Sequence, residues 1–147
     1  MIPLRDANPS VSFPVVTVTL ILINILVFLY EVGLGERVLD RFILTYGFVP
    51  AVYFHLSSAE PWNLPMRIMP MVTSMFLHGG WMHLIGNMWT LWIFGDNVED
   101  RLGRGRYVLY YLACGLAACY IHYLTGPRSG LPVVGATGAI ARTSTFF

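Results

Sequence analysis

Residues 73–95 read TSMFLHGGWMHLIGNMWTLWIFG, and this stretch decides the class of fold. It contains the polar residues His78, His83 and Asn87 but no Asp, Glu, Lys or Arg. A run of about 20 mainly apolar residues is long enough to cross a bilayer as a helix. Because polar groups are costly inside hydrocarbon, each of the three needs a reason to be there, and that reason is usually functional.

The composition of the whole chain points to the same class. The 147 residues are 56% hydrophobic and only 12% charged, with a mean hydropathy of +0.62. Soluble domains average about 25% charged residues, so the chain is predicted to be an integral, multi-pass membrane protein that has the lipid bilayer as a partner. The net charge is +1 and there is no lysine, so the chain has no basic stripe for binding nucleic acid.

The apolar segments predict an all-α fold, a polytopic transmembrane helical bundle that forms one domain, 1–147. Residues 31–69 mix charges, prolines and aromatics, which suits a loop that lies at the bilayer interface. The membrane spans are expected at about 13–30, 71–94 and 107–124, with a partial fourth span from 133.

The end of the chain leaves this fourth span short. The sequence stops at Phe147, which gives the segment only about half the length that a spanning helix needs. We therefore expect the membrane domain to be incomplete, because the chain is either truncated or altered in frame at its C-terminus.

The polar residues of the second apolar segment share one helix face. His83 and Asn87 are four residues apart, whereas His78 falls at or above the helix start. An imidazole and an amide on one face can donate hydrogen bonds to an oxygen that develops negative charge, as acyl transfer requires. Two other interpretations stay open: hydrogen bonds that hold helices together, and a metal or proton-relay site. A metal is least favoured, because no carboxylate or thiolate joins the histidines within helical reach.

The segment Gly135–Ala139, GATGA, is a second candidate. The hydroxyl of Thr137 is flanked by small residues at an expected helix start, where backbone N–H groups are free to bind an oxyanion. The alternative is a helix contact through small residues. The cysteines, Cys114 and Cys119, are five residues apart and are expected to be small buried residues, so no disulfide, metal or cofactor is predicted.

Together these segments strongly resemble the rhomboid family of intramembrane serine proteases. The resemblance is close over residues 73–141 and loose before them. The second membrane helix of the family carries a histidine, another histidine five residues on and an asparagine four further on, followed by Glu-x-Arg and a glycine turn. These positions fall on His78, His83 and Asn87, and then on Glu99, Arg101 and Gly103.

The resemblance implies a six-helix fold whose active site opens to water in the outer leaflet. A serine on the fourth helix attacks a peptide bond in the transmembrane segment of a substrate protein, and a histidine on the sixth helix acts as base. By position, His83 and Asn87 stabilise the oxyanion, with help from backbone N–H groups near Ala136 and Thr137. The implied supporting residues are His78, Gly135, Ala136, Gly138, Glu99 and Arg101.

The sequence departs from the family pattern in two ways. The nucleophile position holds Thr137 rather than serine, and its extra methyl group must fit a site shaped for serine. No histidine follows Thr137 in these 147 residues, and His122 in the third span is poorly placed to replace the base. These departures predict about three and a half of the six spans and an inactive polypeptide as written.

Two functions therefore remain in view. The first is a rhomboid-type intramembrane serine endopeptidase that cleaves transmembrane segments. The second is a catalytically dead rhomboid-like module that binds membrane-protein clients without cutting them. The host membrane expected from the family is the bacterial inner membrane.

Overall fold

A computed structural model describes residues 13–133 of the chain. Within these residues there is no β-strand, and one isolated antiparallel bridge joins Phe48 to Val133. The predicted all-α fold is therefore confirmed. The helices are α1 (Val15–Gly33), α2 (Glu36–Tyr46), α3 (Pro50–Ala59), α4 (Leu64–Thr73), the 3-10 helix η1 (Ser74–Phe76), α5 (Trp81–Leu102) and α6 (Arg104–Thr125).

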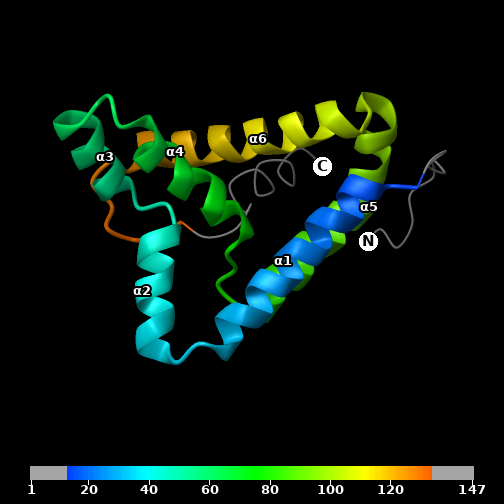
Figure 1. The fold of residues 1–147 in the computed structure, drawn as a ribbon, viewed down its shortest axis with the longest axis horizontal. Helices are drawn as coiled ribbons and strands as arrows, with labels where there is room; N and C mark the ends of the chain where they lie inside the picture. The colour runs from blue at the N-terminus through cyan, green and yellow to red at the C-terminus, as the bar shows by residue number, and fades with distance from the viewer. Residues whose placement is uncertain (1–12, 134–147) are drawn as a thin grey trace.

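Two long helices, α1 and α5, form the main contact of the fold. They run side by side in opposite directions, and α6 turns back from the end of α5 and crosses over α4 (Figure 1). Helices α4 and η1 fill the angle between α6 and α1, while α2 and α3 lie at the other end of the molecule (Figure 1). The loop between η1 and α5 therefore enters the bundle beside the last turn of α1.

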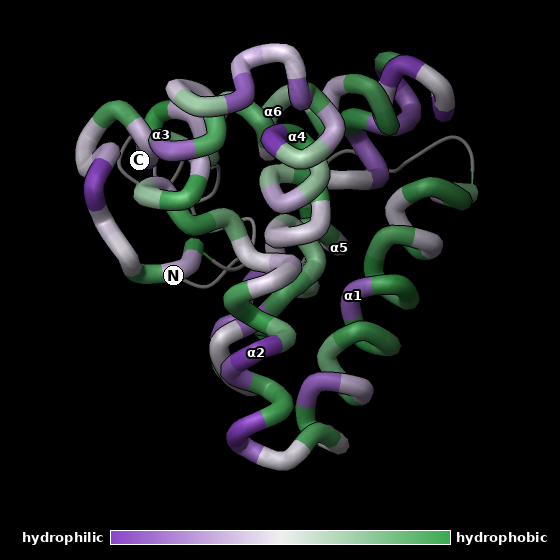
Figure 2. Tube along the Cα trace, turned by 60° about the vertical axis from the view of Figure 1, so that its left-hand side comes forward, coloured by the Kyte–Doolittle hydropathy of each residue, from purple (hydrophilic) through white to green (hydrophobic). Residues whose placement is uncertain are grey.

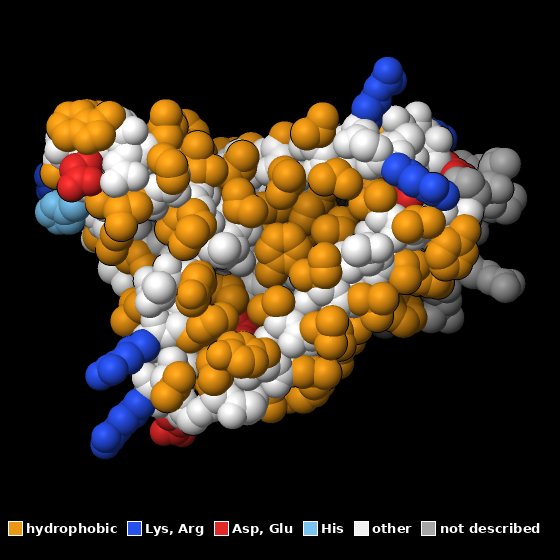
Figure 3. All heavy atoms as spheres, in the orientation of Figure 1, with side chains coloured by type: hydrophobic (Ala, Val, Ile, Leu, Met, Phe, Trp, Pro, Cys, Tyr) orange, Lys and Arg blue, Asp and Glu red, His pale blue; other side chains and the backbone are white. Residues whose placement is uncertain are grey.

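The outer surface of the helices is apolar. Large hydrophobic side chains are exposed along α1 and α5, including Leu26, Trp89 and Trp92. Most residues along α1 are hydrophobic and only some are polar (Figure 2). Hydrophobic side chains cover much of the surface seen in Figure 3, and basic side chains lie at its margins. Among the described residues, α1 and α6 are long and apolar enough to cross a membrane. Such a surface suits lipid rather than water.

The start of α1 is capped by a side chain from α5. The Glu99 carboxyl accepts hydrogen bonds from the backbone N–H of Val16 at 3.0 Å, from the N–H of Thr17 at 2.9 Å and from the Thr17 hydroxyl at 2.9 Å. The first N–H groups of a helix have no partner within the helix, and its N-terminus carries a partial positive charge. Glu99 satisfies both needs and joins the start of α1 to the end of α5.

Gly95 lets α1 and α5 approach each other closely. A Cβ at this position would lie 2.8 Å from Thr17 Cγ2 and 2.8 Å from the Tyr107 hydroxyl, and both of these side chains are buried. We predict that Gly95→Ala lowers the free energy of unfolding by roughly 1–3 kcal/mol, because overpacking outweighs the better helix propensity of alanine. Reversible unfolding in detergent micelles measures this change.

Gly86 supplies a matched control on the same helix. A Cβ at Gly86 would meet nothing within 4 Å, so Gly86→Ala should be neutral or stabilising by up to about 1 kcal/mol. Equal stability of the two variants would mean that the contact between α1 and α5 is not packed as described.

The structure corrects two expectations about the helices. The second span was expected over 71–94, but α5 begins at Trp81 and continues to Leu102. Residues 64–80 form a short helix, a 3-10 turn and a loop instead of one continuous helix. The cause is the prolines inside and before α4, together with the pair Gly79–Gly80. The segment 31–69, expected as an interfacial loop, instead contains the end of α1, all of α2 and α3, and part of α4.

The helices expected as the first and third spans correspond to α1 and α6, and whether each crosses the bilayer stays a prediction. The partial fourth span expected from 133 lies outside the described residues apart from its first residue. Both cysteines are free thiols: Cys119 is buried against Met71 and Ser74, and Cys114 is half-buried.

Candidate functional site

The fold brings together three of the polar residues that the sequence singled out. His78 lies in the loop before α5, His83 in the first turn of α5 and Asn87 one turn further on. The side chains of His78 and Asn87 are each only 5% exposed, and His83 is half-buried. The His78 and His83 rings meet edge to face with centroids 5.3 Å apart. His83 and Asn87 therefore lie one turn apart on α5, and His78 lies before the start of this helix, as expected.

The loop that carries His78 is held by a residue of α1. The backbone N–H of His78 donates to Glu31 Oε2 at 3.2 Å, and His78 Nδ1 lies 3.1 Å from the carbonyl oxygen of Phe76. The Phe28 ring packs edge to face against His78 and Trp81, with centroids 6.4 Å and 4.9 Å away. These contacts fix the direction in which the chain enters α5.

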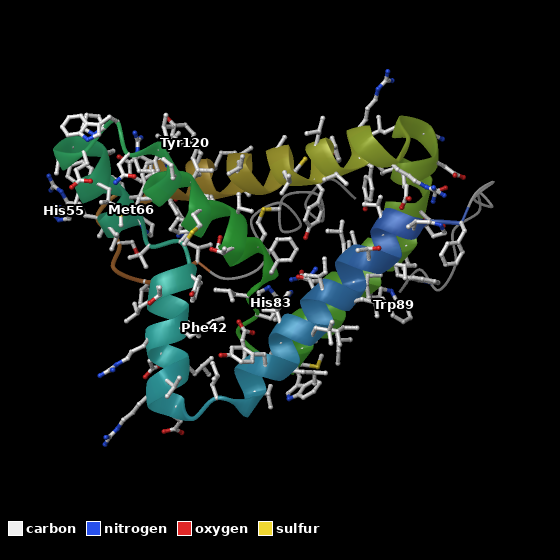
Figure 4. All side chains as sticks on the ribbon, in the orientation of Figure 1. Phe42, His55, Met66, His83, Trp89 and Tyr120 are labelled. Carbon is white, nitrogen blue, oxygen red and sulfur yellow. The ribbon has the colours of Figure 1, made fainter. Side chains whose placement is uncertain are left out.

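The backbone of this loop also contacts the His83 ring. The N–H of Gly79 donates to His83 Nδ1 at 3.4 Å. A ring nitrogen that accepts a hydrogen bond carries no proton, so the proton of the neutral imidazole is on Nε2, which makes Nε2 a donor. Figure 4 shows the His83 side chain beside this loop, whereas Trp89 of the same helix lies on the outer side of the α1–α5 pair.

Asn87 carries a buried donor without an acceptor. Its Nδ2 has no hydrogen-bond partner among residues 13–133, although the atom is removed from solvent. A buried polar group left unpaired costs about 1–3 kcal/mol, and such groups in native proteins call for an explanation. One explanation is a ligand oxygen that accepts this hydrogen bond when it binds.

The predicted supporting residues lie further from the histidines. Glu99 caps α1, as described above, and Arg101 is exposed near the end of α5. Gly103 ends α5 with φ +78°, a left-handed conformation that favours glycine. The structure thus shows a capping contact for Glu99 and a left-handed conformation for Gly103. Their roles in a catalytic site stay predictions.

The other half of the candidate site is not described. The predicted nucleophile position and its neighbours, Gly135, Ala136, Thr137 and Gly138, lie outside residues 13–133. Within the described part of the chain, no three His, Cys, Asp or Glu side chains are grouped closely enough to hold a metal ion.

Sequence reasoning missed Glu31 as a contact of the site. From the sequence, Glu31 is only one of the charges of the mixed segment 31–69. A signal was present, because Glu31 is the first acidic residue after a long uncharged run. Its partner could not be inferred, since the contact joins residues 47 positions apart.

Comparison with known proteins extends this picture. The Rhomboid domain family matches residues 65–143, which include His78, His83 and Asn87. No solved structure matches the chain.

Three relatives illustrate the range of similar proteins. The chain is 31% identical over 128 residues to the putative rhomboid protease YdcA of Bacillus subtilis, covering 87% of this chain and 58% of the relative. It is 33% identical over 109 residues to the chloroplastic rhomboid-like protein 11 of Arabidopsis thaliana, covering 74% of this chain and 36% of the relative. It is 34% identical over 76 residues to the mitochondrial presenilin-associated rhomboid-like protein A of Danio rerio, covering 50% and 20%.

These matches span only part of each relative, at most 58% of the three. The relatives come from bacterial, chloroplastic and mitochondrial settings by their names and organisms, so the bacterial inner membrane stays a prediction for this chain. The match to the family domain covers more than half of the 147 residues and contains the histidine, asparagine and Glu-x-Arg positions. The chain therefore belongs to the rhomboid family.

Proposed function

We propose that the protein is a rhomboid-type intramembrane serine endopeptidase that cleaves transmembrane segments of membrane proteins. In this proposal His83 and Asn87 supply the oxyanion-binding donors, Thr137 occupies the nucleophile position, and His78 supports His83. Residues 138–147 contain no histidine, so the base that this proposal requires is not among them.

The unpaired amide of Asn87 carries this proposal. A donor that is buried and held on a helix needs no reorganisation when negative charge appears on a substrate oxygen. His83 offers Nε2–H from the preceding turn of the same face, because its Nδ1 is occupied by the Gly79 N–H. Two donors on adjacent turns can bind one carbonyl oxygen as it becomes an oxyanion.

Thr137 is a less reactive nucleophile than serine would be at this position. Its hydroxyl could attack a carbonyl carbon only if a base removes its proton, and its β-methyl restricts the side-chain rotamer. In the resemblance, the base is a histidine of a later helix. The endopeptidase reaction is therefore proposed for the protein as its native cell makes it.

The test uses that native protein, purified from membranes and reconstituted in liposomes with fluorogenic transmembrane peptides. We expect cleavage within the membrane segment by this preparation, and cleavage about 10²–10³ slower by its Asn87→Ala variant. Lack of cleavage by the native protein would reject the endopeptidase proposal, and undiminished cleavage by the variant would reject the assigned oxyanion donor.

The second candidate is a rhomboid-like module that binds membrane segments without cutting them. Thr137 at the nucleophile position favours it. Such a module would still seat a client segment against the face of His83, so crosslinking without cleavage would distinguish it from the endopeptidase.

A further inference from the structure

We propose that Glu31 is a positioning residue that sets the tautomer and direction of the His83 imidazole through the loop between η1 and α5. The proposal rests on the function proposed above, because that function gives His83 its role as an oxyanion donor. Its physical content, a coupling between the Glu31 side chain and the His83 ring, is measured without any cleavage assay.

The location of Glu31 is unfavourable unless it has a specific use. It lies in the last turn of α1, where the partial negative charge of the helix C-terminus disfavours a carboxylate. Its side chain is only 2% exposed, and Oε1 is buried without a hydrogen-bond partner in the part of the chain that the structure describes. Burying a carboxyl group that is only partly satisfied is costly. The fold tolerates this cost where the last turns of α1 meet the loop before α5.

The contact that Glu31 does make is with the backbone of the loop. Glu31 Oε2 accepts the N–H of His78 at 3.2 Å, and this bond is buried. His78 lies in the loop between η1 and α5 and belongs to no helix, so its N–H lacks the carbonyl partner that a helix would provide. Glu31 therefore replaces a helical carbonyl and fixes the orientation of the peptide unit before His78.

The next peptide unit of the loop transmits this orientation to the candidate site. The N–H of Gly79 follows that of His78 directly and donates to His83 Nδ1 at 3.4 Å. The His78 ring also packs against the His83 ring at 5.3 Å. Because the first of two consecutive peptide units is held by Glu31 and the second holds the imidazole, loss of the first contact releases the second.

Two hydrogen bonds on adjacent peptide units connect α1 to α5. The first joins Glu31 to the His78 N–H, and the second joins the Gly79 N–H to His83 Nδ1. The second bond places the imidazole proton on Nε2, which makes Nε2 the donor in the proposed site. Glu31 does not touch the reacting atoms in this arrangement. It acts by holding the loop in place. In the proposed function, His83 and Asn87 instead contact the substrate oxygen.

The experiment is NMR of the full-length protein in detergent micelles, with ¹⁵N label in the histidine rings and the backbone. In the unmodified protein we expect His83 Nδ1 at the ¹⁵N shift of an unprotonated ring nitrogen. Glu31→Leu removes the acceptor, and we expect the His83 shifts to move toward a mixture of tautomers. The Gly79 amide should exchange with solvent roughly tenfold faster, since one hydrogen bond is lost.

Glu31→Gln is the rescue variant, because its amide oxygen still accepts the His78 N–H, and it should keep both signals near those of the unmodified protein. Glu31→Asp withdraws the carboxyl by one methylene and should change both signals in the same direction as leucine, which provides a test if the leucine variant does not fold. Glu36→Leu changes an exposed carboxyl of α2 and should change neither signal.

Unchanged His83 shifts and Gly79 exchange in Glu31→Leu or Glu31→Asp, with the amides of α6 still protected, would overturn the proposal. A loss of both signals in Glu31→Gln equal to that in the leucine variant would also overturn it. If the signals respond as expected while the native protein cleaves nothing, the proposed function fails and the coupling from Glu31 to His83 stands.

Discussion

Replacing Glu99 with alanine should lower the free energy of unfolding by about 3–5 kcal/mol. The carboxyl accepts three hydrogen bonds from Val16 and Thr17, and Glu99 is only 3% exposed. Its removal leaves donors unsatisfied at the start of α1, at about 1–3 kcal/mol for each fully buried donor. Unfolding by SDS titration in mixed micelles, followed by circular dichroism, measures the loss.

Two comparisons separate the cap from a general effect of removing an acidic residue. Glu36→Ala removes an exposed carboxyl from α2 and should change stability by less than about 1 kcal/mol. Glu99→Gln keeps one acceptor oxygen and should fall between the unmodified protein and alanine. If Glu99→Ala were as stable as Glu36→Ala, the joint between α1 and α5 would not depend on this cap.

Replacing Asn87 with alanine should lower kcat for a transmembrane substrate by about 10²–10³, with a much smaller change in KM. In the proposed reaction the amide donates only when the substrate carbonyl becomes an oxyanion, so its loss should destabilise the transition state more than the bound substrate. The measurement uses the native protein in liposomes and a fluorogenic membrane segment.

Asn87→Asp is the sharper variant, because it keeps the shape of the side chain but replaces the donating amide with an accepting oxygen. It should lose at least as much kcat as alanine. Thr90→Ala, less than one turn further along α5, removes a hydroxyl that bonds only the Gly86 carbonyl and should leave kcat nearly unchanged. A normal kcat in Asn87→Asp would exclude Asn87 as an oxyanion donor.

The pattern of apolar and polar residues was enough to predict the fold class and the shared face of the site. The uncharged run before Glu31 and the apolar run from Tyr107 gave helices close to their expected positions. Spacing of four residues placed His83 and Asn87 on adjacent turns of one helix, as the periodicity of a helix requires. Both inferences depend on local sequence alone.

The errors arose where local sequence gives conflicting signals. The apolar character of residues 71–80 favoured a continuous span, but Pro70 and the two glycines before Trp81 favour a break, and the break prevailed. The charges of α2 and the prolines of α3 and α4 suggested a loop, although Pro50 and Pro65 occupy the first turns of helices, where proline is tolerated.

The contacts of the site could not be predicted, because they join distant parts of the chain. Glu31 meets His78 and Glu99 meets Thr17 only after α1 has packed along α5. The sequence showed that His78 was a polar residue in an apolar segment. It did not show which partner would satisfy it.

The most direct test of the account is site-specific photocrosslinking from α5 to a membrane segment in liposomes. A photoreactive amino acid replaces His83 in one preparation and Trp89 in the other, since Trp89 lies on the same helix but on the outer side of the bundle (Figure 4). Both proposed functions predict capture of the segment from position 83 at a yield above that from position 89. Equal capture from the two positions, or capture from position 89 alone, would contradict a substrate or client site on the face of His83 and Asn87.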